Sequence, residues 1–186
     1  MTTLLFVRHG PTDWTGEKRL QGRTDIDLSV SGRESAAALV PLIAAWEPRT
    51  VIASPLSRTR TTASILSPLE PLVDERWAEA GLGEWEGRRA EEIGADYLGW
   101  RAGRLLPPGA EGTAAVTARV TAAVQSAVAQ PGPVLIVTHG GTIRSVLANY
   151  VGLTTAHLEP VGAPSLTVLD IGTTGEARLR HYNVLA

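Results

Sequence analysis

Three short apolar segments, each followed by a turn and a helical pattern, constrain the fold of this chain more than any other feature. They are Thr3–Val7, Thr50–Ala53 and Val134–Thr138. Each segment is rich in strand-forming residues and has the length of a strand that is buried on both faces. Buried strands that alternate with helices form a largely parallel sheet. The pattern therefore predicts an α/β fold of three layers, with helices on both faces of a mostly parallel central sheet.

Helical patterns fill the intervals between these strands. A capping box from Ser31 to Glu34 predicts a helix that continues to about Trp46 and is bent at Pro41. Further helices are expected over residues 57–66, 91–104, 113–129 and 141–151, and further strands over 166–171 and 177–184. No linker or repeat interrupts these patterns, so residues 1–186 are predicted to form a single domain.

Composition narrows the classes of function. The formal net charge is −2, which provides no general basic surface for nucleic acid or for an anionic membrane. The chain has no cysteine, which excludes disulfides, thiolate metal sites and cysteine nucleophiles. No apolar run approaches the ~20 residues of a membrane span, and the features of a secretory signal are missing. We therefore expect a cytoplasmic protein.

Cationic and imidazole side chains follow all three strands. Arg8 and His9 end the first, Ser54 and Arg58 follow the second, and His139 ends the third. Functional residues of parallel sheets gather at the carboxyl ends of strands, so these side chains are expected at one edge. Taken singly, such an arginine is most often a solvated charge and such a histidine a structural residue. Their repetition favours a bound anion, because clustered cations otherwise repel one another.

A phosphate group suits such a site. Guanidinium groups grip phosphate oxygens with paired bonds, and the N–H groups of Gly140 and Gly141 at a helix start add donors. A metal site is disfavoured, because arginines repel a divalent cation and no carboxylate lies beside either histidine. The arginines also favour a neutral imidazole, the form that can attack phosphorus. The departing alcohol needs a proton donor, and spacing alone does not choose among Glu79, Glu84 and Glu86.

Several motifs follow one another along nearly the whole chain. They are Arg8-His9-Gly10, Gln21-Gly22 with the acidic turn after it, Ser54-x-Leu56-x-Arg58 with Thr62-Ala63, Glu79 with Gly83-Glu84-Trp85-Glu86-Gly87, Gly109 and Glu111 with Arg119, and Val137-Thr138-His139-Gly140-Gly141. Together they resemble the histidine phosphatase superfamily, in its phosphoglycerate-mutase-like branch. The resemblance implies the fold of that family, which agrees with the three-layer α/β prediction.

The resemblance also implies roles for individual residues. His9 would be the nucleophile that becomes phosphohistidine, and Glu79 the proton donor and then the base that activates water. The remaining implied contacts to the phosphoryl group come from Arg8, Arg58, His139, Thr15, Gln21, Gly22 and Gly140. Thr15 stands where the family usually has asparagine, and its side chain is shorter. No metal or organic cofactor is implied, the expected partner is a small phosphorylated metabolite, and a homodimer is compatible with the range of assemblies in the family.

The predicted activity is hydrolysis of a small phosphate monoester. A cofactor-dependent phosphoglycerate mutase is the first alternative, but mutases of the family carry longer insertions over the pocket and a tyrosine where this chain has Leu82. A non-catalytic phospho-ligand-binding protein is the second, and the presence of both His9 and Glu79 argues against it. Four arginines form either a solvated helix face or an entrance that selects acidic substrates: Arg88, Arg89, Arg101 and Arg104.

Overall fold

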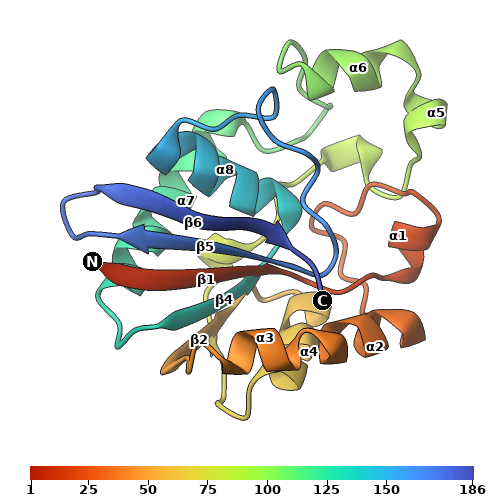
Figure 1. Ribbon diagram of the computed structural model, residues 1–186. Coiled ribbons are helices and arrows are strands. Elements are labelled where there is room, and N and C mark those ends of the chain that lie inside the picture. Colours follow the sequence, from red (N-terminus) through yellow and green to blue (C-terminus); the bar gives the residue numbers. More distant parts are fainter.

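A six-stranded sheet in the order β3-β2-β4-β1-β5-β6 forms the centre of the protein (Figure 1). The computed structural model describes residues 1–186. Strands β1 (Thr2–Arg8), β4 (Val134–Thr138), β2 (Thr50–Ala53) and the short edge strand β3 (Leu72–Val73) are parallel. Strands β5 (Ser165–Ile171) and β6 (Ala177–Val184) extend the sheet in antiparallel pairing. The predicted α/β class with a mostly parallel sheet is confirmed.

Helices cover both faces of this sheet (Figure 1). One face carries α2 (Val30–Ala38), α3 (Val40–Ala44) and α4 (Ser57–Leu66), and the other carries α7 (Thr113–Val128) and α8 (Gly140–Val151). The short helices α1 (Asp13–Gly16), α5 (Ala90–Ile93) and α6 (Ala95–Arg101) lie beyond the carboxyl end of β1, and η1 (Glu75–Trp77) and η2 (Gly83–Trp85) are single 3₁₀ turns. None of the helices combines the length and the hydropathy that a bilayer crossing requires.

Strand β1 shows how the sequence anchors the sheet in two cores. Leu4 and Phe6 belong to a cluster of 18 buried residues on the side of α7 and α8. Leu5 and Val7 point the other way, into a cluster of 12 buried residues beneath α3 and α4. Burial of each such side chain contributes roughly 1.5–3 kcal/mol. Because both faces are packed, the strand register, and with it the position of each strand end, is held firmly.

Three features of the helices differ from the sequence-based predictions. The helix expected to continue to about Trp46 is divided, because α2 ends at Ala38 and α3 begins at Val40, with Pro41 in the first turn of α3. The cap of α2 is Ser29 and not Ser31, because the Ser29 side chain accepts the Gly32 N–H at 3.0 Å from an extended backbone. The single helix expected over 91–104 is divided into α5 and α6. The division falls at Gly94, whose φ of +74° is a left-handed conformation that breaks the helix.

Candidate active site

The register between β1 and β4 brings His9 and His139 together. Arg8 pairs with Thr138 in the sheet, and the His9 N–H donates to the Thr138 carbonyl at 3.0 Å. The residues that follow these two strands therefore leave the sheet side by side. Their ring centroids lie 5.2 Å apart, with the ring planes inclined by 62°. Both side chains are buried, so the pair sits inside the protein at the edge predicted from the strand ends.

His9 holds an unshared electron pair on one ring nitrogen. Its Nδ1 lies 2.7 Å from the Gly10 carbonyl oxygen, which can only accept, so Nδ1 carries the proton. Burial lowers the pKa of His9 well below 6.5, and the charges of Arg8 and Arg58 lower it further. The ring is therefore neutral near pH 7, and the lone pair lies on Nε2. This is the state in which an imidazole acts as a nucleophile.

Ser54 forms a hydrogen bond with one ring nitrogen of His139. Ser54 Oγ lies 2.7 Å from His139 Nε2, and a hydroxyl can either donate or accept in such a bond. In the tautomer in which Ser54 donates to Nε2, the ring proton is on Nδ1, which has no partner in the protein. Burial lowers the pKa of His139 well below 6.5, and the positive charges of protonated His9, Arg58 and Arg8 would lower it further. In the tautomer protonated on Nδ1, His139 offers one N–H donor from a neutral ring.

Arg8 and Arg58 are held from behind by backbone carbonyl groups. Arg58, in the first turn of α4, is fully buried and donates to the carbonyls of Thr24 and Gly22 at 2.8 and 2.7 Å. Arg8 donates from Nη1 to the Val161 carbonyl. Burial lowers the pKa of both guanidinium groups. In each arginine Nε is buried without a hydrogen-bond partner.

Three buried nitrogen donors at this edge therefore lack partners, namely Arg8 Nε, Arg58 Nε and His139 Nδ1. Leaving a buried donor unpaired costs about 1–3 kcal/mol. Such groups are rare in native structures, and a catalytic role, a bound ion or an ordered water molecule accounts for many of them. A phosphoryl group can accept from all three nitrogens and also offset the charges of the two arginines.

Glu79 is separated from the other two candidate carboxylates by its position. Its Oε2 accepts the Gly141 N–H and its Oε1 accepts the Ala80 N–H, each at 3.0 Å, so the carboxylate rests on the first turn of α8. A Cβ at position 141 would lie 2.4 Å from Glu79 Oε1, so any larger residue there would displace the carboxylate from this position. Glu84 is exposed. Glu86 is occupied elsewhere, since it accepts backbone N–H groups from Arg23, Thr24 and Leu82.

A cavity of about 250 Å³ collects most of the predicted site residues. Its lining includes Arg8, His9, Gln21, Gly22, Arg58, Glu79 and Gly140. His139 is not part of the lining, but its ring packs against the ring of His9, which is. Thr15 is also outside the lining, because its hydroxyl accepts the Thr12 N–H at 3.1 Å and the Gln21 side-chain amide at 3.0 Å. Gln21, and not Thr15, therefore faces the cavity.

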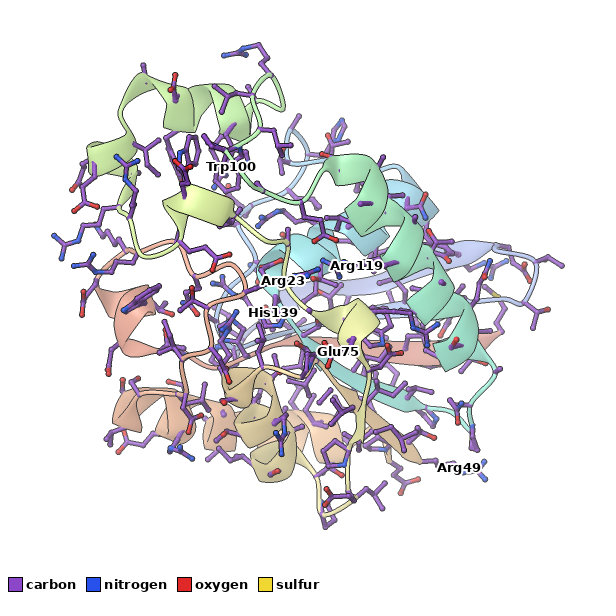
Figure 2. The ribbon with its side chains drawn as sticks, turned by 180° about the vertical axis from the view of Figure 1, so that it is seen from behind. Arg23, Arg49, Glu75, Trp100, Arg119 and His139 are labelled. Atoms are coloured by element: carbon purple, nitrogen blue, oxygen red, sulfur yellow. The ribbon has the colours of Figure 1, made fainter.

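A clamp of three charged residues, Arg23, Glu111 and Arg119, holds the segment that carries Glu79. Arg119 Nη1 donates to two carbonyl groups of that segment, each at 2.7 Å, and the rest of its guanidinium binds Glu111 at 2.8 and 2.9 Å. Arg23 donates to Glu111 at 3.1 Å and to the Glu79 carbonyl at 3.2 Å. Figure 2 shows Arg23 and Arg119 in the middle of the molecule, near His139. The clamp fixes the backbone from which the Glu79 side chain extends.

Sequence comparison identifies the family to which this arrangement belongs. The family model described as the histidine phosphatase superfamily, branch 1, matches residues 4–184. The chain is a member of the histidine phosphatase superfamily. The match spans all the strand ends described above, so the predicted family is confirmed together with the fold.

Curated relatives and solved structures support the assignment to this superfamily. A glucosyl-3-phosphoglycerate phosphatase of Mycolicibacterium vanbaalenii is 34% identical over 167 residues, which cover 81% of this chain and 74% of the relative. A probable phosphoglycerate mutase GpmB of Salmonella paratyphi C is 30% identical over 166 residues, which cover 82% and 76%. A mycobacterial glucosyl-3-phosphoglycerate phosphatase, solved in complex with VO3, has a TM-score of 0.87 at 31% identity and covers 99% of this chain and 100% of its own.

Several residues that line this cavity were missed by the sequence reasoning, and Arg144 is the charged one nearest to Gly140. Arg144 lines the cavity and lies one helical turn beyond Gly140 on α8. The four-residue spacing is visible in the sequence and places both residues on one face of the helix. Of the four arginines left open above, Arg101 also lines this cavity, whereas Arg88 and Arg89 do not.

Proposed function

We propose that this member of the histidine phosphatase superfamily hydrolyses a small-molecule phosphate monoester through a phosphohistidine on His9. The observation that carries the proposal is the set of three unpaired buried nitrogen donors beside a neutral imidazole. The resemblance to a glucosyl-3-phosphoglycerate phosphatase supports hydrolysis as the outcome. A cytoplasmic location, a single domain and a homodimer stay predictions.

The first chemical step transfers the phosphoryl group to the enzyme. Arg8, Arg58 and His139 donate hydrogen bonds to the phosphoryl oxygens and hold phosphorus in front of His9 Nε2. The Nε2 lone pair forms the N–P bond while the bond from phosphorus to the ester oxygen breaks. Glu79, protonated at this stage, gives its proton to that oxygen, which leaves as an alcohol.

The second step returns the enzyme to its starting state. The Glu79 carboxylate, now ionised, takes a proton from a water molecule as its oxygen attacks phosphorus. The N–P bond breaks, inorganic phosphate leaves, and His9 regains its neutral ring. The N–H groups of Ala80 and Gly141 keep the Glu79 carboxyl group in one place through both steps.

Neither step needs a metal ion or an organic cofactor. Two guanidinium groups supply the positive charge that a divalent cation provides in metal-dependent phosphatases. The structure brings no three histidine, aspartate or glutamate side chains within reach of one metal ion. We therefore expect EDTA to leave the hydrolysis of 4-nitrophenyl phosphate unchanged.

Trapping of the covalent intermediate tests the proposal. Rapid quenching during turnover of a phosphate ester is expected to yield an acid-labile phosphorus adduct on the wild-type protein. His9→Ala should yield neither adduct nor turnover, and His157→Ala, which changes an exposed histidine away from the cavity, should yield both. Turnover by wild type with no adduct at any quench time would contradict the phosphohistidine route.

A phosphoglycerate mutase is the second candidate, because a probable GpmB mutase is 30% identical to this chain. It requires that the phosphoenzyme return its phosphoryl group to a bound intermediate before water reaches it. Incubation with 3-phosphoglycerate and its bisphosphate primer separates the two. Rapid formation of 2-phosphoglycerate without phosphate release would favour the mutase, and release of inorganic phosphate favours the phosphatase.

A further inference from the structure

A second cavity, of about 510 Å³, adjoins the phosphoryl cavity. The two share a wall made of Ala80, Leu82, Trp100, Arg101, Gly141 and Arg144. Figure 2 shows Trp100, a residue of α6, on the side of the site away from the sheet. A ligand cavity of this size accommodates far more than a phosphate group. The second cavity is therefore available to the alcohol part of a phosphate ester.

Arg144 stands at the junction of the two cavities without a partner. Its side chain is half-buried, lines both cavities and forms no ion pair. The side chains of Arg144 and Arg8 both lie close to Gly140. A Cβ built at Gly140 would be 3.6 Å from Arg144 Nη1 and 3.5 Å from Arg8 Cδ. Its charge also contributes to the lowered pKa of Arg8. Two cations so close are unfavourable unless each has an anion beside it.

No other charged residue of the second cavity supplies an anion to Arg144, and the other arginines there are more exposed than Arg144. Glu111 is already bound through both oxygens to Arg119. Arg101 and Arg104 are exposed, so water and salt screen their charges. Arg144 is the cation of this cavity that is partly shielded from solvent and still unpaired.

We propose that Arg144 binds a carboxylate on the alcohol part of the substrate, which makes the enzyme selective for carboxylated phosphate esters. The inference rests on the proposed function, because it places the phosphoryl group on Arg8, Arg58 and His139. A planar guanidinium matches a planar carboxylate in shape and in number of bonds. A single positive charge balances one carboxylate, whereas a second phosphate would bring a dianion. The side chains of Arg8 and Arg144 are close together beside Gly140, which suits a substrate whose phosphate and carboxylate are joined by a short carbon chain.

A matched pair of esters tests this assignment. 3-Phosphoglycerate and glycerol 3-phosphate share one carbon skeleton and differ by a carboxylate in place of a hydroxymethyl group. We expect wild type to show the higher kcat/KM for 3-phosphoglycerate. Arg144→Met should lower the ratio of the two kcat/KM values about 10- to 100-fold, the loss of a charge-assisted hydrogen-bonded pair, through the KM for 3-phosphoglycerate. Arg144→Lys, which keeps the charge, should recover part of the ratio.

The control removes an equal charge elsewhere. Arg49 is exposed and lies at the far end of the sheet in Figure 2, so Arg49→Met should leave the substrate ratio unchanged. An equal loss for both esters in Arg144→Met would place Arg144 on the phosphoryl group and overturn the inference. An unchanged ratio in Arg144→Met would overturn it as well.

Binding measurements separate this inference from the proposed function. In a His9→Ala background, isothermal titration calorimetry gives the affinity for each ester without turnover. Arg144→Met should reduce the affinity ratio by the same factor of about 10 to 100. If wild type forms no phosphohistidine while this affinity ratio still depends on Arg144, the proposed function fails and the carboxylate site stands. An affinity ratio that ignores Arg144 overturns the site whatever the chemistry.

Discussion

The two buried histidines predict that the protein loses stability as the pH falls from about 7.5 to about 5.5. In the folded protein, burial and neighbouring charges keep the pKa of His9 and His139 well below 6.5. In the unfolded chain both rings are hydrated and titrate near 6.5. Below that pH the unfolded state binds two protons that the folded state does not bind. Because protons then favour the unfolded state, the free energy of unfolding decreases as the pH falls.

The magnitude follows from proton linkage. A histidine that titrates near 6.5 when unfolded and stays neutral when folded contributes about 1.4 kcal/mol over this interval. The two rings together contribute about 2.7 kcal/mol. This is a large fraction of the roughly 5–15 kcal/mol that stabilises an ordinary domain. Carboxyl groups of the unfolded chain titrate near pH 4 and add most of their effect below the interval.

Urea unfolding followed by circular dichroism measures this change. The buffers must contain no phosphate or sulfate, because an anion in the cavity would stabilise the folded state. His9→Gln and His139→Gln should each reduce the pH-dependent loss to about half of the wild-type loss. The reasoning is refuted if wild type is equally stable at both pH values, or if both single variants keep the full wild-type loss.

Three further outcomes concern the proton donor, its clamp and the orientation of His139. Glu79→Gln should slow phosphorylation of the enzyme by alkyl phosphates about 10²- to 10⁴-fold and by 4-nitrophenyl phosphate far less, since nitrophenolate leaves without a proton; equal slowing in rapid-quench kinetics would contradict its role as an acid. Arg119→Met should reduce the free energy of unfolding by about 1.5–3 kcal/mol and slow alkyl phosphates more than 4-nitrophenyl phosphate; a loss of stability with no such selectivity would make the clamp purely structural. Ser54→Ala leaves His139 Nε2 without its donor, so inorganic phosphate should inhibit about 10-fold more weakly, and an unchanged inhibition constant would show that Ser54 does not orient the ring.

The part of the site carried by strand ends was predictable from the sequence. Apolar runs locate β1, β2 and β4, and parallel strands deliver the residues after them to one edge. His9, Arg58 and His139 therefore follow from a local pattern and a general rule. The same reasoning predicted cations around an anion, and the unpaired nitrogens Arg8 Nε and His139 Nδ1 are the structural counterpart of that prediction.

The choice among carboxylates was not predictable in this way, because it depends on contacts between distant segments. Glu86 accepts the Arg23 backbone N–H, which holds its carboxylate away from the cavity. The sequence around Glu86 does not show this contact, because Arg23 is distant in the chain. Thr15 was expected near phosphate, but a local capping box with Thr12 binds its hydroxyl. The break at Gly94 depends on a backbone conformation that a glycine permits but does not require.

The position of β1 has a consequence for the order in which the protein folds. The strand lies in the interior of the sheet between β4 and β5, yet it comes first in sequence among the six strands. Its neighbours in the sheet come much later in the sequence, as does Val161, whose carbonyl accepts a hydrogen bond from Arg8. A chain that ends before Val161 therefore lacks the carbonyl group that binds Arg8 in the candidate site. Phosphate binding at the candidate site would therefore require that the loop before β5 has already packed beside Arg8.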